Sequence, residues 1–127
     1  MKCILQRIKG EKMKERNRNL LEETLAVLQR CDLKESDIEW VGSIDGEYVM
    51  SWKKAKKIFN IEYDASYGGQ EIASDLVVVG KEWWLERGEY DGSEWWEYKE
   101  LPQPKEAKPF KNIQADIGWE SIKELNE

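Results

Sequence analysis

The side chains best placed to do chemistry are two glutamates set between two tryptophans. Asp91-Gly92 is a pair that favours a type I′ turn, and a two-residue turn there puts Glu86 directly opposite Glu97. Like charges in that position destabilise a strand pair by up to about 1 kcal/mol, so they call for a reason. Such a pair could bind a cation, share a proton, or act as the acid and nucleophile of a retaining glycosidase, whose carboxyls lie about 5 Å apart. The structural alternative weighs more: both glutamates extend into water, or Lys99 or the lysines of residues 53–57 neutralise them.

Side chains alternate between the two faces of a strand, so the two tryptophans of each adjacent pair, Trp83-Trp84 and Trp95-Trp96, lie on opposite faces of the predicted sheet. One face has the composition of a core and collects Leu76, Val78, Trp83, Leu85, Arg87, Trp96 and Tyr98. Arg87 is expected above the ring of Trp96 as a cation–π pair. The other face, which we call the Trp/Glu face, offers the candidate binding residues Trp84, Glu86, Tyr90, Trp95, Glu97 and Lys99. On this face Gly88 stands opposite Trp95 and leaves room for the indole, which is a structural reason for that pair.

These strands belong to a predicted three-stranded antiparallel meander over residues 75–100. A two-residue turn at Gly80-Lys81 would pair Val78 with Trp83. Upstream, the turn signal Asp45-Gly46 lies between two β-rich runs and predicts a hairpin over residues 38–50.

Two helices are expected beside these strands. Apolar spacing predicts an amphipathic helix over about residues 14–31. Ser51 is a natural N-cap for a second helix over 52–59, with Trp52, Ala55, Ile58 and Phe59 on its apolar side. The four lysines on its other side form a solvated face or, less commonly, a dock for an acidic partner.

The predicted fold is therefore α+β, with an antiparallel sheet (hairpin plus meander) packed against an N-terminal amphipathic helix and a short Lys-rich helix. A chain of 127 residues fits one domain, which we place at residues 1–101, with residues 1–13 open to disorder. Residues 102–127 are expected to form a linker of Pro, Lys and Glu followed by a weakly helical tail. This tail is a candidate partner-contacting or disordered end.

The composition excludes several classes of catalytic and metal-binding site. The sequence contains no histidine, which removes Ser-His-Asp and Cys-His nucleophile chemistry and the commonest transition-metal ligand. The glycine-rich phosphate-binding motifs G-x-G-x-x-G and G-x-x-x-x-G-K-[ST] are both absent from the sequence. The two cysteines, Cys3 and Cys31, lack zinc-site spacing and are expected as reduced thiols. We assign no catalytic residue, no metal ligand and no cofactor, and the balance leans away from an enzyme.

Charge is unevenly distributed along the chain. Residues 1–19 carry seven Lys/Arg against two Glu, although the formal net charge of the protein is −6. A basic arm can contact phosphate, but an acidic domain repels nucleic acid, so the charge distribution argues against nucleic-acid binding. No apolar run is long enough for a membrane span, and the N-terminal sequence lacks the apolar region of a signal peptide, so the expected location is the cytoplasm.

One stretch of sequence is similar to known proteins. It contains DIEWVGS, YDASYGGQEIASDL and WWLERGEYDGSEWWEYK, and over about residues 37–102 it resembles small uncharacterised proteins encoded in phages and prophages of Gram-positive bacteria. The resemblance implies a phage or prophage origin and the cytoplasm of a bacterial host. The leading hypothesis is a non-enzymatic accessory protein that binds a host or phage protein. The alternatives are carbohydrate or small-ligand binding, less readily hydrolysis, on the Trp/Glu face, and nucleic-acid contact through the basic arm.

Overall fold

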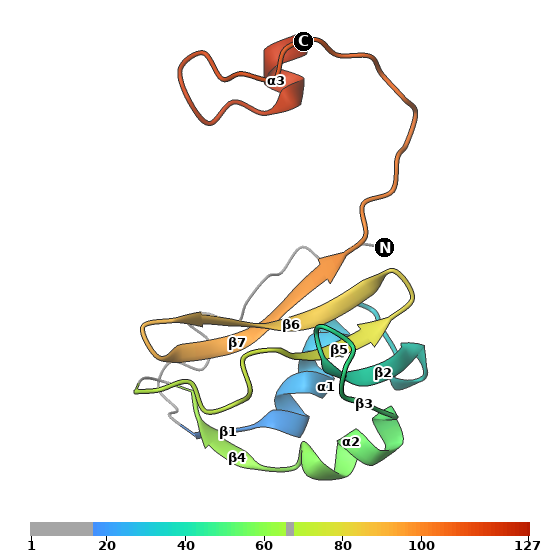
Figure 1. The fold of residues 1–127 in the computed structure, drawn as a ribbon, viewed down its shortest axis with the longest axis vertical. Coiled ribbons are helices and arrows are strands. Elements are labelled where there is room, and N and C mark those ends of the chain that lie inside the picture. The colour runs from blue at the N-terminus through green and yellow to red at the C-terminus, as the bar shows by residue number, and fades with distance from the viewer. Residues whose placement is uncertain (1–16, 66–67) are drawn as a thin grey trace.

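The computed structural model describes residues 17–65 and 68–127 (Figure 1). In chain order its elements are β1 (Asn17–Asn19), α1 (Leu20–Arg30), the 3-10 helix η1 (Glu35–Asp37), β2 (Ile38–Ser43), β3 (Val49–Met50), α2 (Trp52–Ile58), β4 (Glu62–Asp64), β5 (Leu76–Gly80), β6 (Trp83–Tyr90), β7 (Ser93–Glu100) and α3 (Ile122–Asn126). Within the described residues, five strands form one antiparallel sheet in the order β3-β2-β5-β6-β7, and β1 pairs with β4. Helices combined with antiparallel sheets confirm the predicted α+β class.

Strands β6 and β7 form the hairpin that the tryptophan pattern predicted. Glu86 pairs with Glu97, and Gly88 pairs with Trp95. The turn residues Asp91 and Gly92 have φ angles of 55° and 84°, the left-handed conformation that a type I′ turn requires at both positions. The predicted register of this hairpin is confirmed.

The connection between β5 and β6 differs from the prediction. Val78 pairs with Leu85 and not with Trp83, because the connecting residues are Lys81 and Glu82. A side chain at Gly80 would collide with the indole of Trp83, so this glycine marks a close approach and not the turn. The register is shifted by two residues, and a shift of two leaves every side chain on its expected face.

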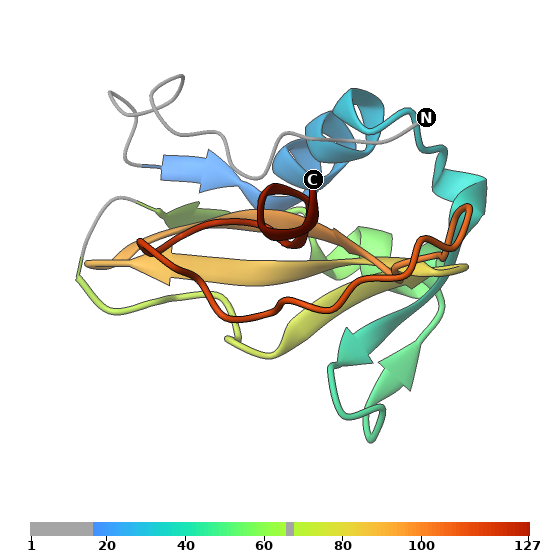
Figure 2. The same ribbon diagram turned by 90° about the horizontal axis from the view of Figure 1, so that it is seen from above.

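The core lies between the five-stranded sheet and the helices α1 and α2. Its buried residues are Leu20, Val27, Leu28, Cys31, Val41, Ala55, Phe59, Tyr63, Ala65, Ile72, Val78, Trp83, Leu85, Trp96 and Tyr98. The Phe59 ring of the α2 end stacks on Trp96 with 6.4 Å between centroids. Trp96 Nε1 also donates a hydrogen bond to Thr24 Oγ1 of α1 at 2.8 Å. Figure 2 shows α1 over one side of the sheet, and the apolar residues of the predicted core face are buried in this core.

The N-terminal half departs from the prediction at its start. Helix α1 begins at Leu20, because the Asn19 side chain caps it by accepting a hydrogen bond from the N–H of Glu22 at 3.0 Å. The sequence did not predict β1 and β4, whose three residues each leave no periodic pattern to recognise. The expected helix is therefore wrong over residues 17–19, which form β1, and its first positions, 14–16, lie outside the described residues.

The predicted hairpin of residues 38–50 is present, with Val41 paired to Met50. Ser51 caps α2 as expected, since its Oγ accepts from the N–H of Lys54 at 3.2 Å. Ala55 and Phe59 are buried, but Ile58 is 57% exposed, so its expected place on the apolar side is wrong.

Cys31, directly after α1, is buried and disulfide-bonded. The expectation of a reduced thiol is therefore wrong at Cys31. Cys3 lies outside the described residues.

After β7 the chain leaves the sheet as an exposed segment and ends at α3 (Figure 1). Asn126 ties the two ends of this last part together: its Oδ1 accepts from the N–H of Lys111 at 3.1 Å and of Asn112 at 3.0 Å. Ser121 and Glu124 form a capping box at the start of α3. The weak helix expected in the tail is thus confined to residues 122–126.

Candidate functional site

The Trp/Glu face places each of its glutamates next to an indole of the same strand. Trp84 Nε1 donates to Glu86 Oε1 at 2.7 Å, and Trp95 Nε1 donates to Glu97 Oε2 at 3.0 Å. Side chains two residues apart on a strand share a face, which brings both pairs into reach. Each carboxylate therefore has a neutral donor at its side, and this explains how Glu86 and Glu97 tolerate facing each other.

Lysine supplies the remaining compensation. Lys99 Nζ lies 3.7 Å from Glu97 Oε1, and both side chains are partly exposed. Neutralisation by Lys99 was one of the structural explanations for the glutamate pair, and this contact agrees with it. The lysines of residues 53–57 belong to α2, which packs on the opposite face through Ala55 and Phe59.

Gly88 sets the position of Trp95. A Cβ at Gly88 would lie 2.5 Å from Trp95 Nε1 and 2.6 Å from Glu97 Oε2, so indole and carboxylate occupy the space of the missing side chain. Trp95 is only 9% exposed although it points away from the core beneath α1. The pair is a glycine covered by an aromatic ring across two strands, which stabilises the sheet.

Five of the six candidate residues lie together. Trp84, Glu86, Trp95, Glu97 and Lys99 occupy neighbouring positions of β6 and β7. Tyr90 ends β6 beside the turn and is 74% exposed. The face offers carboxylate oxygens and indole rings to a ligand, but both indole N–H groups are already used within the protein.

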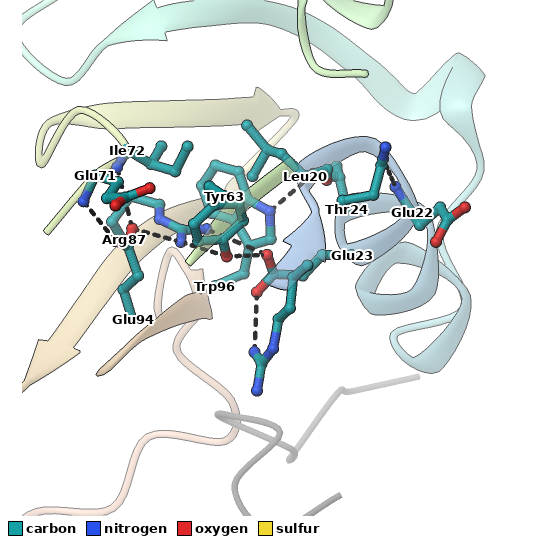
Figure 3. A network of polar contacts seen from close by, with 12 residues as sticks. Leu20, Glu22, Glu23, Thr24, Tyr63, Glu71, Ile72, Arg87, Glu94 and Trp96 are labelled. Atoms are coloured by element: carbon teal, nitrogen blue, oxygen red, sulfur yellow. Dashed lines mark hydrogen bonds and ion pairs between the residues drawn. The ribbon is translucent and has the colours of Figure 1, made fainter. Parts of the chain in front are cut away.

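The sequence reasoning missed a second cluster, which is buried in the core (Figure 3). Arg87 Nη2 donates hydrogen bonds to Glu94 Oε1 at 2.9 Å and to the hydroxyl of Tyr63 at 3.0 Å. The hydroxyl of Tyr63 donates in turn to Glu23 Oε1, whose carboxylate also lies near Arg87 and Arg18. This Glu23–Tyr63–Arg87–Glu94 network joins α1, β4, β6 and β7.

The cation at the centre of this network is also held by rings. The Cζ of Arg87 lies 4.6 Å from the ring centroid of Trp96 and 5.6 Å from that of Tyr63. The predicted cation–π contact with Trp96 is therefore confirmed. Arg87 Nε and Nη1 have no hydrogen-bond partner among the described residues, and contact with aromatic faces partly offsets the cost of burying them.

The Glu94 carboxylate binds the backbone of the loop that precedes β5. Its Oε2 accepts from the N–H of Glu71 at 2.7 Å and its Oε1 accepts from the N–H of Ile72 at 3.4 Å. Its own N–H donates to the carbonyl of Ala65 at 3.1 Å. A carboxylate with two backbone donors and an arginine is well compensated for burial, so Glu94 has a structural role.

Glu23 is less well compensated. Burial raises the pKa of the Glu23 carboxyl above its ordinary value of 4.5, and the nearby Arg87 and the Tyr63 hydroxyl oppose this only in part. Burial also raises the pKa of Tyr63. A buried carboxyl with a raised pKa resembles a general acid. However, tyrosine, arginine and tryptophan side chains surround the network, so we assign it a role in packing the core.

No protein-family profile, no curated protein and no solved structure matches this chain.

Residues 17–65 and 68–127 contain no cluster of three or more His, Cys, Asp or Glu able to hold a metal ion. No helix in this part of the chain is long and apolar enough to cross a membrane.

Among the described residues, the tail beyond β7 presents the two most exposed large apolar side chains. Trp119 is 99% exposed and Ile117 is 87% exposed, and Phe110, Ile113 and Ile122 are exposed as well. Trp119 has a φ of 69°, a left-handed conformation that is rare for a bulky residue. The preceding turn is held by Glu120, whose carboxylate accepts from the N–H groups of Ile117 and Gly118 at 3.1 and 2.8 Å.

Proposed function

We propose that this protein is a non-enzymatic accessory protein of phage or prophage origin that binds another protein through its C-terminal tail. The observation that carries the proposal is Trp119, which stands almost fully exposed on a backbone of positive φ. A large apolar side chain in this state costs free energy in the isolated protein. Binding to a partner recovers that cost when the indole enters a pocket.

The environment of Trp119 supports a role in recognition. Tryptophan is among the residues that most often dominate the binding energy of protein interfaces. Local hydrogen bonds hold the turn, with Glu120 on one side and the Asn126 closure on the other. A preformed turn loses less conformational entropy on binding than a disordered peptide does.

The connection to the domain also suits a docking segment. Residues 101–109 are exposed and include three prolines, Pro102, Pro104 and Pro109. Proline-rich segments are semi-rigid and extended, so the tail is held away from the sheet. Figure 1 shows this separation.

The proposal is tested with the full-length protein as bait in a lysate of the bacterial host, with captured proteins quantified by mass spectrometry. The variant Trp119→Ala should lose the specific partner. Tyr90→Ala is the matched control, because it removes another exposed aromatic from the Trp/Glu face. A partner is then confirmed by calorimetry with purified proteins. If wild-type bait returns nothing specific, or if both variants retain the partner equally, the proposal fails.

The second candidate is carbohydrate or small-ligand binding on the Trp/Glu face. It is favoured by Trp84, which is partly exposed and held in orientation by Glu86. Stacking of a sugar on this indole would change its fluorescence, and Trp84→Ala would abolish the change. Nucleic-acid contact through the basic arm falls mainly on residues 1–16, outside the described residues.

The proposed setting is the cytoplasm of a bacterial host. The disulfide at Cys31 is uncommon in that compartment. Cell fractionation combined with thiol labelling tests the location and the disulfide independently. A cytoplasmic protein with a free Cys31 thiol would agree with the proposed location and contradict the disulfide.

A further inference from the structure

The outer side of α2 is a basic surface with apolar side chains at its end. Lys53, Lys54 and Lys57 are exposed and form no ion pair with any described residue, whereas the fourth lysine of the run, Lys56, is bound to Glu35 at 2.8 Å. Ile58 and Ile61, which follow the lysines, are 57% and 46% exposed. We call Lys53, Lys54, Lys57, Ile58 and Ile61 the α2 patch.

The end of the tail has the complementary composition. Residues 116–127 contain four acidic side chains and one lysine. The same twelve residues present the exposed apolar side chains of Ile117, Trp119 and Ile122. A surface with cations and isoleucines suits a segment with carboxylates and an indole, because opposite charges attract while the apolar side chains leave water.

The two surfaces of one chain do not meet. In Figure 1 the tail leaves the sheet at the top of the domain, and α2 lies at the bottom. The proline-containing segment 101–109 directs the tail away from the domain. A second copy has no such restriction, and two copies related by a two-fold axis can exchange tails so that the same contact forms twice.

We propose that the acidic end of the tail docks on the α2 patch of a second copy, which makes the protein a tail-exchanged homodimer. Trp119 lies against Ile58, Ile61 and the aliphatic stems of the lysines, whose ammonium groups reach the indole and the carboxylates. The inference rests on the proposed function, because both treat the tail as a docking segment. It names a second copy of this chain as one protein to which the tail binds.

The experiment is sedimentation velocity on the purified full-length protein over a concentration series. The wild type should associate reversibly to a dimer, and high salt should weaken the dimer because screening removes the attraction between charges. Two variants each reverse one side of the contact. The first is Lys53→Glu/Lys54→Glu/Lys57→Glu, and the second is Asp116→Lys/Glu127→Lys. The second leaves Glu120 and Glu124 in place, because their carboxylates accept backbone hydrogen bonds in the tail's own turns, whereas Glu127 makes only exposed ion pairs with Lys108 and Lys123.

Each variant alone should dimerise at least about tenfold more weakly than the wild type, since both its surfaces then carry the same sign. Their mixture should form a heterodimer, because each tail then meets an α2 patch of opposite charge. Lys81→Glu is the matched control: it reverses one exposed lysine outside both surfaces and should dimerise as the wild type does. Circular dichroism verifies that all variants are folded.

The inference is overturned if the wild type stays monomeric at about 1 mM, or if the mixed variants fail to associate. Failure of the proposed function is recognised separately. A monomeric protein that still captures a host or phage partner through Trp119 retains the proposed function without the dimer. A dimer that captures no other protein retains the dimer without the host or phage partner.

Discussion

Arg87 and Glu94 form an ion pair at 2.9 Å in which both side chains are fully buried. Removing one partner of such a pair leaves an uncompensated charge in the core, which costs about 3–5 kcal/mol. Glu94→Ala should reach this range, because it also leaves the N–H groups of Glu71 and Ile72 without their acceptor. Urea unfolding measures the loss, with the exposed Glu47→Ala as the control that changes stability by less than about 0.5 kcal/mol. A loss below about 1 kcal/mol would contradict the role of Glu94.

Glu23 makes the stability of the protein depend on pH. Burial raises the pKa of Glu23 in the folded state, so the folded protein favours the protonated carboxyl. The contribution of Glu23 to the free energy of unfolding is therefore fully present below the ordinary pKa of 4.5 and is lost as pH rises through the raised value. Glu23→Gln keeps the acceptor for Tyr63 but does not ionise. Relative to the wild type, this variant should gain stability steadily as pH increases from 4.5, as followed by thermal unfolding in a pH series. Parallel curves for the two proteins would show that Glu23 does not titrate abnormally.

The sequence predicted the β6–β7 hairpin well because local chemistry decides it. Asp91-Gly92 fixes the turn, and alternation then assigns each tryptophan to a face. The same alternation puts Glu94 on the face of Trp96 and Tyr98, and this was the available signal for a buried charge on the core side. In α1, Glu23 likewise lies three residues after the buried Leu20 and four before the buried Val27.

Other features depend on contacts distant in sequence. Glu94 is compensated by the N–H of Glu71, 23 residues away, and Tyr63 reaches Glu23 across 40 residues. Neither periodicity nor turn chemistry reports such contacts. Gly80 misled the prediction because a glycine favours both a turn and a close approach by an aromatic ring, and only the packed position of Trp83 distinguishes them.

Gly88 should tolerate no side chain. Gly88→Ala places a Cβ 2.5 Å from Trp95 Nε1, so the indole must move and its hydrogen bond to Glu97 must break. A loss of about 1–3 kcal/mol is expected from such overpacking, together with a red shift of tryptophan fluorescence as Trp95 becomes exposed. Gly69→Ala is the control, since a Cβ there meets nothing within 4 Å. Equal stability of the two variants would show that Trp95 does not need the space at Gly88.

The two indole–carboxylate pairs of the Trp/Glu face should differ in strength. Trp95 is buried and Trp84 is partly exposed, so water can replace the acceptor only at Trp84. Glu97→Ala should therefore cost about 1–3 kcal/mol, the penalty for a buried donor without a partner, and Glu86→Ala should cost less. Unfolding of both variants by urea at one pH makes the comparison. If Glu86→Ala is the more damaging change, the glutamate at position 86 has a role beyond accepting the Trp84 hydrogen bond.

The tail should contribute to association and not to the fold of a single chain. A protein ending at Leu101 keeps the hydrogen bond from the N–H of Leu101 to the carbonyl of Glu82 at 2.8 Å and removes only exposed or partly exposed residues. At low concentration its free energy of unfolding should match the full-length protein within about 0.5 kcal/mol. A dimer links stability to concentration by mass action, so the melting temperature of the full-length protein should rise with concentration while that of the truncated protein stays constant. Calorimetry at several concentrations measures both. A truncated protein that is unstable at every concentration would instead place the tail within the folded domain, against the predicted boundary near residue 101.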